Sequence, residues 1–386
     1  MCLLEDIPLW LRIIYRLFGI VQFTCKSPQN YFLQILPRLW SLPLFFFYCY
    51  CCVELIKIFV VIKEHDLLKT ELIVTFLALL AILTCMVVFM FRSNKLKILL
   101  KKLDEIKLER VHEQKERCLK LLVLTLLLLL SCFVPYLFSW PVFYIMYYKV
   151  PPGICFLNHL FLSNVLDIIC SQFTVINKEL ERELRRISTN KIFFLYKNKR
   201  SKELKENDKF SSISCIEKLS FLHYNLVHLT VEITKLFDIS TILSMVLWFG
   251  YVICCLYFFI KPFLEGTTRS TLYYSYLICD FIFYCLWLLI MIRTCTHTQT
   301  EASKTTSYIH QAWNYFCEKE NIDGKVRHLH LISLRLLNTK LRFTARNFFS
   351  LDESFMRMMV AAVTTYFVIT IEFRMNDNIL NGRPVV

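Results

Sequence analysis

Glycine is scarce in this chain, with six residues among 386, which disfavours a glycine-zipper helix bundle and a glycine-rich nucleotide-binding loop. No GxGxxG or Walker pattern is present. The sequence also lacks an HExxH motif, a paired aspartate motif and a serine–histidine constellation. These absences argue against a membrane enzyme, so we expect neither catalytic residues nor a cofactor.

The amino-terminal segment lacks the features of a signal peptide. Met1–Phe23 carries Glu5, Asp6, Arg12 and Arg16 and contains no small-residue cleavage site. We therefore expect nothing in this segment to direct the amino terminus out of the cell.

Charge is absent from two long apolar runs, Leu72–Phe91 and Leu121–Tyr148. Each run is long enough to cross the ~30 Å hydrocarbon layer of a bilayer as a helix. The chain is 56% hydrophobic overall. Together these features predict a polytopic integral membrane protein.

Seven spans are predicted, and no strand-like alternation in ten-residue segments accompanies them, so the expected fold is all-α. The last span is the least apolar because it contains Arg357 and Glu372. The seven are Leu39–Ile62, Leu72–Phe91, Leu121–Tyr148, Ile154–Ile176, Ile239–Ile260, Thr271–Ile292 and Phe355–Phe373.

The distribution of lysine and arginine predicts the orientation. The amino-terminal segment and the second, fourth and sixth loops hold 35 of these residues, and the other loops and the tail hold 7. By the positive-inside rule the amino terminus is cytoplasmic and the carboxyl terminus extracellular. The net charge of +14 therefore indicates membrane orientation, and we expect no nucleic-acid partner.

The predicted outer loops are too short to form a ligand-binding ectodomain, and they contain no glycosylation sequon and no cysteine pair. An external ligand would therefore bind within the helix bundle. Most of the 17 cysteines lie within apolar runs, where small polarizable side chains commonly pack, so we expect packing residues rather than disulfide, metal or redox sites.

Two spans are predicted to continue beyond the membrane as helices. A helix from Ile154 to Ser188 would measure ~50 Å, roughly 20 Å more than a bilayer requires. Lys197–Lys209 is typical of a solvated linker. Ahead of the fifth span, apolar residues recur at helical spacing at Phe210, Ile213, Ile216, Leu219, Leu226 and Leu229.

A further amphipathic stretch occupies Thr305–Phe343. Its apolar stripes, and those of the helix extensions, must either pack together as a cytoplasmic bundle or lie on the membrane surface. Length and direct continuity with the spans favour the bundle. The apolar positions in this stretch are Ile309, Trp313, Phe316, Leu329, Leu331, Leu334 and Leu337.

The last forty residues carry the most specific pattern. Phe348-Phe349-Ser350-Leu351-Asp352 precedes a helix containing Thr365-Tyr366, five mostly hydrophobic residues, and then Glu372-Phe373. This resembles the insect gustatory receptor family, related to the insect olfactory receptors, whose hallmark is Thr-Tyr, five such residues, and Gln-Phe. Glu372 departs from that pattern.

The resemblance implies a tetrameric ligand-gated cation channel of the plasma membrane of sensory neurons, gated by small-molecule tastants. It also implies homomeric or heteromeric assembly with other receptors of the family, an intracellular anchor built from helix extensions, and a pore lined by four copies of the seventh helix. On this basis the chain divides into a cytoplasmic segment (1–38), six spans with their extensions (39–292), a cytoplasmic loop with the anchor helix (293–354), the pore helix (355–373) and an extracellular tail (374–386).

Pore residues are predicted from spacing and from the resemblance. One helical face of the seventh span carries Ala361, Thr365, Val368 or Ile369, and Glu372. The resemblance adds Phe373 to the gate. The alternative for Glu372 is a carboxylate that extends from the helix end into the membrane interface.

Ionisable and aromatic residues inside spans are candidate ligand contacts. Glu54 and Lys57, three residues apart, are expected to pair with each other. The aromatic candidates have an alternative role in the interfacial belt of the membrane. The candidate ligand residues are Trp140, Tyr144, Tyr251, Tyr257, Tyr274 and Asp280.

A secondary transporter is the alternative function, although repeated halves and glycine- or proline-broken helices are not evident. His328 and His330 are two residues apart on an expected helix and would face different directions, so we predict no shared metal ion.

Overall fold

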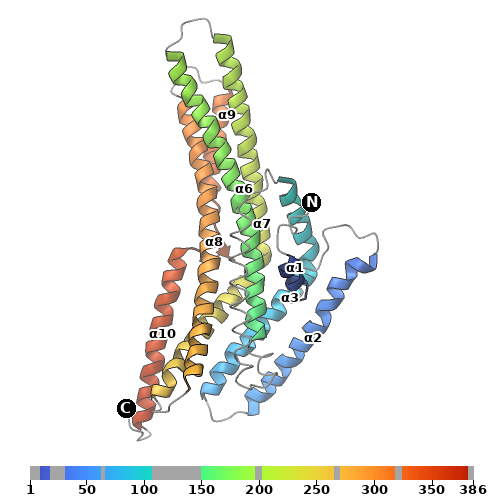
Figure 1. Cartoon of the computed structure of the whole chain (residues 1–386), viewed down its shortest axis with the longest axis vertical. Coiled ribbons are helices and arrows are strands. Elements are labelled where there is room, and N and C mark those ends of the chain that lie inside the picture. The colour runs from blue at the N-terminus through green and yellow to red at the C-terminus, as the bar shows by residue number, and fades with distance from the viewer. Residues whose placement is uncertain are drawn as a thin grey trace.

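The computed structural model describes residues 9–17, 31–61, 66–106, 149–195, 202–264, 270–317 and 324–380, which are almost entirely helical (Figure 1). The all-α prediction is confirmed. The elements are α1 (Leu9–Leu17), α2 (Tyr31–Val61), α3 (Asp66–Ile106), α6 (Val150–Leu195), α7 (Lys202–Leu264), α8 (Thr271–Cys317), α9 (Gly324–Asn338), β1 (Thr344–Ala345), β2 (Phe349–Ser350) and α10 (Glu353–Leu380).

Six of the seven predicted spans fall on these helices, and the third, Leu121–Tyr148, lies outside the described residues. Five helices in the described part of the chain are long and apolar enough to cross a membrane. They are α3, α6, α7, α8 and α10, within which the candidate spans are Leu72–Ile106, Val150–Ile187, Ser212–Phe263, Tyr273–Tyr315 and Glu353–Phe373.

Four of the described helices, α3, α6, α7 and α8, run well past the length that a bilayer needs, with 41 to 63 residues each. At 1.5 Å per residue, the 63 residues of α7 correspond to ~95 Å. The extended parts of α6, α7 and α8 pack against one another and against α9, at the top of Figure 1. Ile216, Leu226 and Ile309 are fully buried in this bundle. The extensions therefore bury their apolar stripes against each other.

The apolar stripe predicted for α9 is wrong in part. Leu329 is buried, but Leu331 and Leu334 are 64% and 43% exposed, and Leu337 is also exposed. The side of α9 that faces the bundle instead carries Ser333 and Leu336. Apolar residues surround more than half of this helix, so spacing alone does not select the buried face.

Several boundaries also differ from the prediction. Residues 202–209, expected to be linker, form the first turns of α7, since Lys, Glu and Leu are good helix formers. The helix α6 begins at Val150 rather than 154, with Pro151 in its first turn, where a missing N–H costs nothing. The helix α10 continues to Leu380, beyond the predicted start of the tail.

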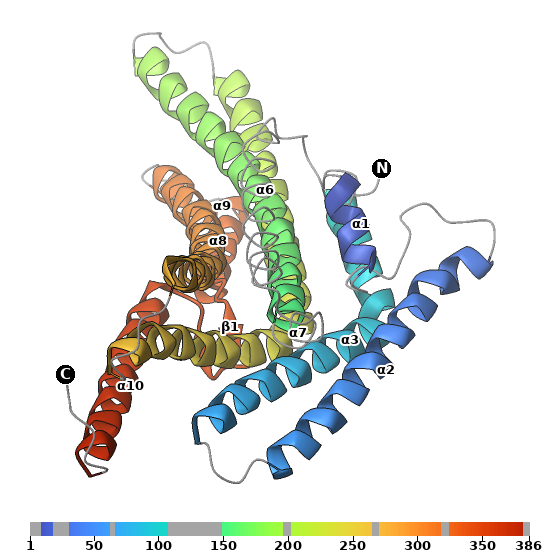
Figure 2. The same ribbon diagram turned by 60° about the horizontal axis from the view of Figure 1, so that its bottom comes forward.

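A short hairpin joins the anchor helix α9 to α10. β1 and β2 pair antiparallel, with Thr344 opposite Ser350. Arg346 and Asn347 at its tip have φ angles of 51° and 63°, as in a type I′ turn, whose twist matches that of the flanking strands. β1 packs on α7 (Figure 2), so the hairpin ties the start of α10 to the middle of the molecule.

Asp352 caps α10. One carboxylate oxygen accepts the N–H of Phe355 at 2.9 Å, and the other accepts the Ser350 hydroxyl at 2.7 Å. These bonds lower the pKa of Asp352, the Ser350 hydroxyl most of all. Phe349 stacks on Phe355 with ring centroids 4.4 Å apart. The Phe-Ser-Leu-Asp sequence that precedes α10 thus supplies the contacts that fix where this helix begins.

Candidate functional site

The helix α10 packs on the rest of the chain through one side. Phe355 and Val363 are buried on that side, and Tyr366 meets Phe249 of α7 edge-to-face at 5.5 Å. The second half of α7 changes direction and crosses toward α10, which brings these two rings together (Figures 1 and 2). In the apolar stretch of 18 residues that could cross the membrane, 11% is buried in α10, compared with 94% in α6. In one copy of the chain, α10 is therefore a peripheral helix.

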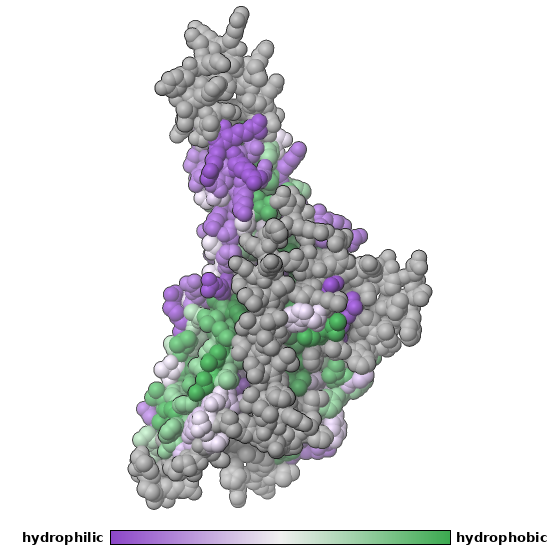
Figure 3. Space-filling model, viewed as in Figure 1, coloured by the Kyte–Doolittle hydropathy of each residue, from purple (hydrophilic) through white to green (hydrophobic). Residues whose placement is uncertain are grey.

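All six residues predicted for the pore lie on the exposed side of α10. Val368 is 47% and Phe373 69% exposed, and Ile369 is 39% exposed. The Thr365 hydroxyl donates to the carbonyl of Ala361 at 3.0 Å, so its hydrogen already has an acceptor within the helix. Glu372 and Ala361 are exposed as well. Figure 3 shows this apolar surface over α10.

Asp280 forms an ion pair that sequence spacing did not reveal. It accepts from the ammonium group of Lys149, which precedes α6 and lies 131 residues earlier in the chain. Both side chains are buried, Asp280 with 3% exposure. The same ammonium group lies 4.6 Å from the ring centroid of Tyr276, in cation–π geometry. Buried charges are tolerated when they are paired in this way.

Aromatic side chains surround this pair. Tyr251 stacks on Tyr284 with an interplanar angle of 9° and ring centroids 5.0 Å apart. The indole N–H of Trp248 donates to the Tyr284 carbonyl at 2.7 Å, and Trp287 contacts Tyr284. Tyr284 is also within electrostatic reach of Asp280. The structure thus gathers Tyr251 and Asp280, two of the predicted ligand residues, into one cluster between α7 and α8.

The other predicted ligand residues are distributed differently. Tyr274 packs with Phe259 and Phe263 in a separate and more exposed aromatic group, with centroids 5.7 and 5.8 Å apart. Tyr257 is buried. Trp140 and Tyr144 lie outside the described residues.

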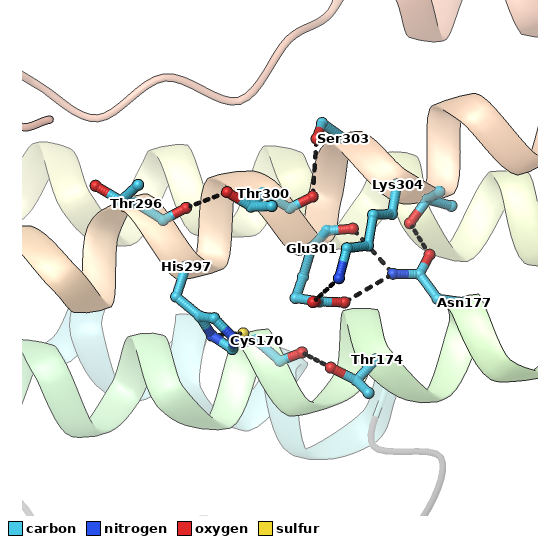
Figure 4. Close-up of polar contacts among 10 residues, drawn as sticks. Cys170, Thr174, Asn177, Thr296, His297, Thr300, Glu301, Ser303 and Lys304 are labelled. Carbon is cyan, nitrogen blue, oxygen red and sulfur yellow. Dashed lines mark hydrogen bonds and ion pairs between the residues drawn. The ribbon is translucent and has the colours of Figure 1, made fainter. Parts of the chain in front are cut away.

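A polar ladder that was missed from sequence joins α6 to α8 in the extended bundle (Figure 4). The Asn177 amide donates to both the carbonyl and the carboxylate of Glu301, at 3.0 and 3.1 Å. Thr305 donates to the Asn177 carbonyl oxygen at 2.6 Å, and Lys304 binds Glu301. Nearby, the Cys170 thiol and His297 Nδ1 are 3.0 Å apart. Such bonds fix the register of the two helices.

Other predicted contacts take the following forms. Glu54 and Lys57 pair at 2.8 Å, as expected. The cysteines from Cys49 to Cys295 in the described part of the chain are free thiols, and Cys85 packs beside Ser240 in the core. His328 contacts Glu217 of α7, whereas His330 stacks on Trp313 of α8, so the two imidazoles face different helices.

The fold defines a multi-pass helical membrane protein with long helix extensions and a peripheral last helix. The chain matches the family model described as 7tm chemosensory receptor over residues 11–377, and it belongs to that family. It is a multi-pass protein of the plasma membrane. This agrees with the resemblance to gustatory receptors found in its last forty residues.

Individual relatives support this assignment. The chain is 31% identical over 98 residues to gustatory and pheromone receptor 32a of Drosophila melanogaster, a match that spans 25% of this chain and 20% of that relative's length. The structure of insect olfactory receptor OR5 from Machilis hrabei matches with a TM-score of 0.69 at 13% identity, over 94% of this chain and 97% of that chain. The OR5 structure in complex with eugenol matches with a TM-score of 0.64 at 13% identity, over 94% and 98% of the two chains. At this identity the likeness establishes a shared fold.

Proposed function

We propose that this chain is a gustatory receptor that acts as a ligand-gated, non-selective cation channel for small-molecule tastants. The observation that carries the proposal is the exposed side of α10, which holds the predicted pore residues, among them Thr365, Glu372 and Phe373 of the family motif. A carboxylate on the exposed side of a membrane helix is energetically unfavourable when only lipid surrounds that side. Assembly of several copies around a water-filled axis removes that cost.

Four copies are expected from the family resemblance, either of this chain alone or with related receptors. Their seventh helices would line the pore with Thr365, Val368 and Ile369, an apolar constriction suited to a gate. Glu372 would form a ring near its outer end. The exposed leucines of α9, Leu331 and Leu334, would be covered by neighbouring copies in the same assembly.

The orientation follows from the charge distribution. The helix extensions lie at the opposite end of the molecule from the carboxyl terminus (Figure 1). With the lysine- and arginine-rich loops in the cytoplasm, the extensions form a cytoplasmic anchor and the carboxyl terminus lies outside.

The ligand site is the aromatic cluster around Lys149 and Asp280. Tyr251 is only partly buried, so the face of its ring that is turned away from Tyr284 suits stacking against a small molecule, and the buried charges would direct the polar groups of that molecule. Tyr257, Tyr274, Trp140 and Tyr144 extend this proposal to the neighbouring spans.

Ligand-evoked current in a heterologous cell tests the proposed function. A panel of tastants is first tested by calcium imaging, and active compounds are then applied during whole-cell recording. We expect a cation current in cells that express the receptor. Thr365→Trp should reach the surface but lose most of that current, since an indole from each copy would fill the constriction. Saturable, ion-coupled uptake without current would instead favour a transporter.

A further inference from the structure

Cations from three separate elements converge beside the hairpin. The partly buried carboxylate of Asp238 on α7 is within electrostatic reach of Arg346 at the hairpin tip, Lys235 on α7 and Arg92 on α3. Arg92 and Arg346 are both exposed. Elements that are far apart in sequence therefore present positive charge to one patch of surface, which we call the hairpin cluster.

Lys95 and Glu232 extend the hairpin cluster, and in the described part of the chain its cations outnumber its carboxylates. Glu232 binds Lys95 at 2.9 Å and Lys235 at 3.3 Å, so one carboxylate serves two ammonium groups. With Asp238 as the second acid, two carboxylates face four cations when Arg92 and Arg346 are included. The excess positive charge is available to an anion.

Arg346 lies at the tip of the hairpin in a backbone conformation that is uncommon for arginine. Its φ of 51° lies in the left-handed region, which glycine, asparagine and aspartate tolerate far better than a long side chain. The turn is fixed by the Phe348 N–H, which donates to the Ala345 carbonyl at 3.0 Å, and by the contact between Thr344 and Asn347 at 3.2 Å. Arg346 is thus exposed at the tip of a hydrogen-bonded turn.

The hairpin cluster is bordered by two phenylalanines that project outward. Phe91, next to Arg92, is 82% exposed, and Phe348, two residues after Arg346, is 80% exposed. Among the described residues these are the two most exposed large apolar side chains. A cation beside an exposed aromatic ring suits the boundary between headgroups and hydrocarbon. The hairpin lies at that level, since the apolar surface of α10 begins immediately after it (Figure 3).

We propose that the hairpin cluster binds the phosphorylated headgroup of an anionic membrane lipid, with Arg92 and Arg346 on the phosphates and Phe91 and Phe348 against the acyl chains. Charge complementarity selects the anion, and the exposed rings favour a lipid over a free phosphate. In the orientation proposed above, this lipid belongs to the cytoplasmic leaflet. Because the hairpin leads directly into α10, the bound lipid would hold the start of the pore helix at the membrane surface.

Lipid binding is tested on the full-length receptor in phosphatidylcholine nanodiscs. Short-chain phosphatidylinositol 4,5-bisphosphate is titrated while thermal stability and intrinsic fluorescence are followed. We expect saturable binding to the wild type. The double variant Arg92→Gln with Arg346→Gln should bind about 30-fold more weakly, because each cation near an anionic surface contributes about fivefold. Arg92→Lys with Arg346→Lys, which keeps both charges, should stay within a few-fold of the wild type.

Two controls separate the alternatives. Arg327→Gln, an exposed arginine on α9, removes a positive charge away from the hairpin cluster and should leave affinity unchanged. Phe348→Ser should weaken binding of the lipid but not of inositol trisphosphate, whereas equal effects on both would indicate a free-phosphate site. Equal lipid affinity of the wild type and the double glutamine variant would overturn the proposal. The titration uses neither tastant nor current, so its result is independent of whether the channel function holds.

Discussion

Asp280→Ala is expected to destabilise the receptor by about 3–5 kcal/mol, because it leaves the Lys149 ammonium group buried without its carboxylate partner. Fluorescence-detected size exclusion after heating should show a lower melting temperature and less monodisperse protein. Lys149→Met should have a similar effect, since it removes the ammonium group that the buried Asp280 carboxylate binds.

The double variant Lys149→Met with Asp280→Leu distinguishes a structural role from a ligand contact. Replacing both charges by apolar side chains of similar volume is often neutral for stability, so this variant should recover most of the lost melting temperature. If the pair contacts ligand, the recovered protein should still respond poorly to tastants. Glu179→Ala, which breaks the exposed pair with Arg182 on the polar extension of α6, is the matched control and should change little. Full stability of Asp280→Ala would show that the ion pair has no structural role.

Glu372→Gln is expected to weaken divalent-cation block of the ligand-evoked current. A divalent cation ~4 Å from one ionised carboxylate gains about 2 kcal/mol even in a water-like dielectric. Loss of that interaction corresponds to about a 30-fold increase in the blocking concentration. The substitution also restores the glutamine of the family motif, so folding should be preserved.

The informative measurements for this variant are calcium permeability relative to sodium and the concentration of calcium that halves the current. Because calcium binds more weakly, its relative permeability should fall and its half-blocking concentration should rise. Glu353→Gln, at the other end of α10 and also exposed, is the control that changes charge without touching the predicted ring. Unchanged permeability and block in Glu372→Gln would place that carboxylate at the lipid interface instead.

Features that lie within one helix were predictable from the sequence. The exposed side of α10 is the face that a three-to-four-residue spacing selects, and the Glu54–Lys57 pair lies within one turn. The long extensions followed from the continuity of helix-forming residues with the spans. Each of these inferences needed only the geometry of a single helix.

Features that depend on how helices meet were not predictable. Asp280 has its partner 131 residues away, and Asn177 binds Glu301 across 124 residues, so neither pair leaves a local signal. For α9, apolar residues on two sides left the choice of buried face to the packing of α7 and α8. The hairpin cluster likewise forms from three elements whose arginines and lysines appear in sequence as ordinary cytoplasmic charge.

The central claim is that the exposed side of α10 lines a conducting pore, and modification of single introduced cysteines tests it most directly. Thr365→Cys lies on the exposed side, and Met359→Cys lies on the side packed against the core. Both are recorded during ligand-evoked current, with the wild type as the control for native cysteines. A charged methanethiosulfonate reagent should inhibit Thr365→Cys and leave Met359→Cys unchanged. Inhibition of Met359→Cys, with Thr365→Cys unaffected, would contradict the account.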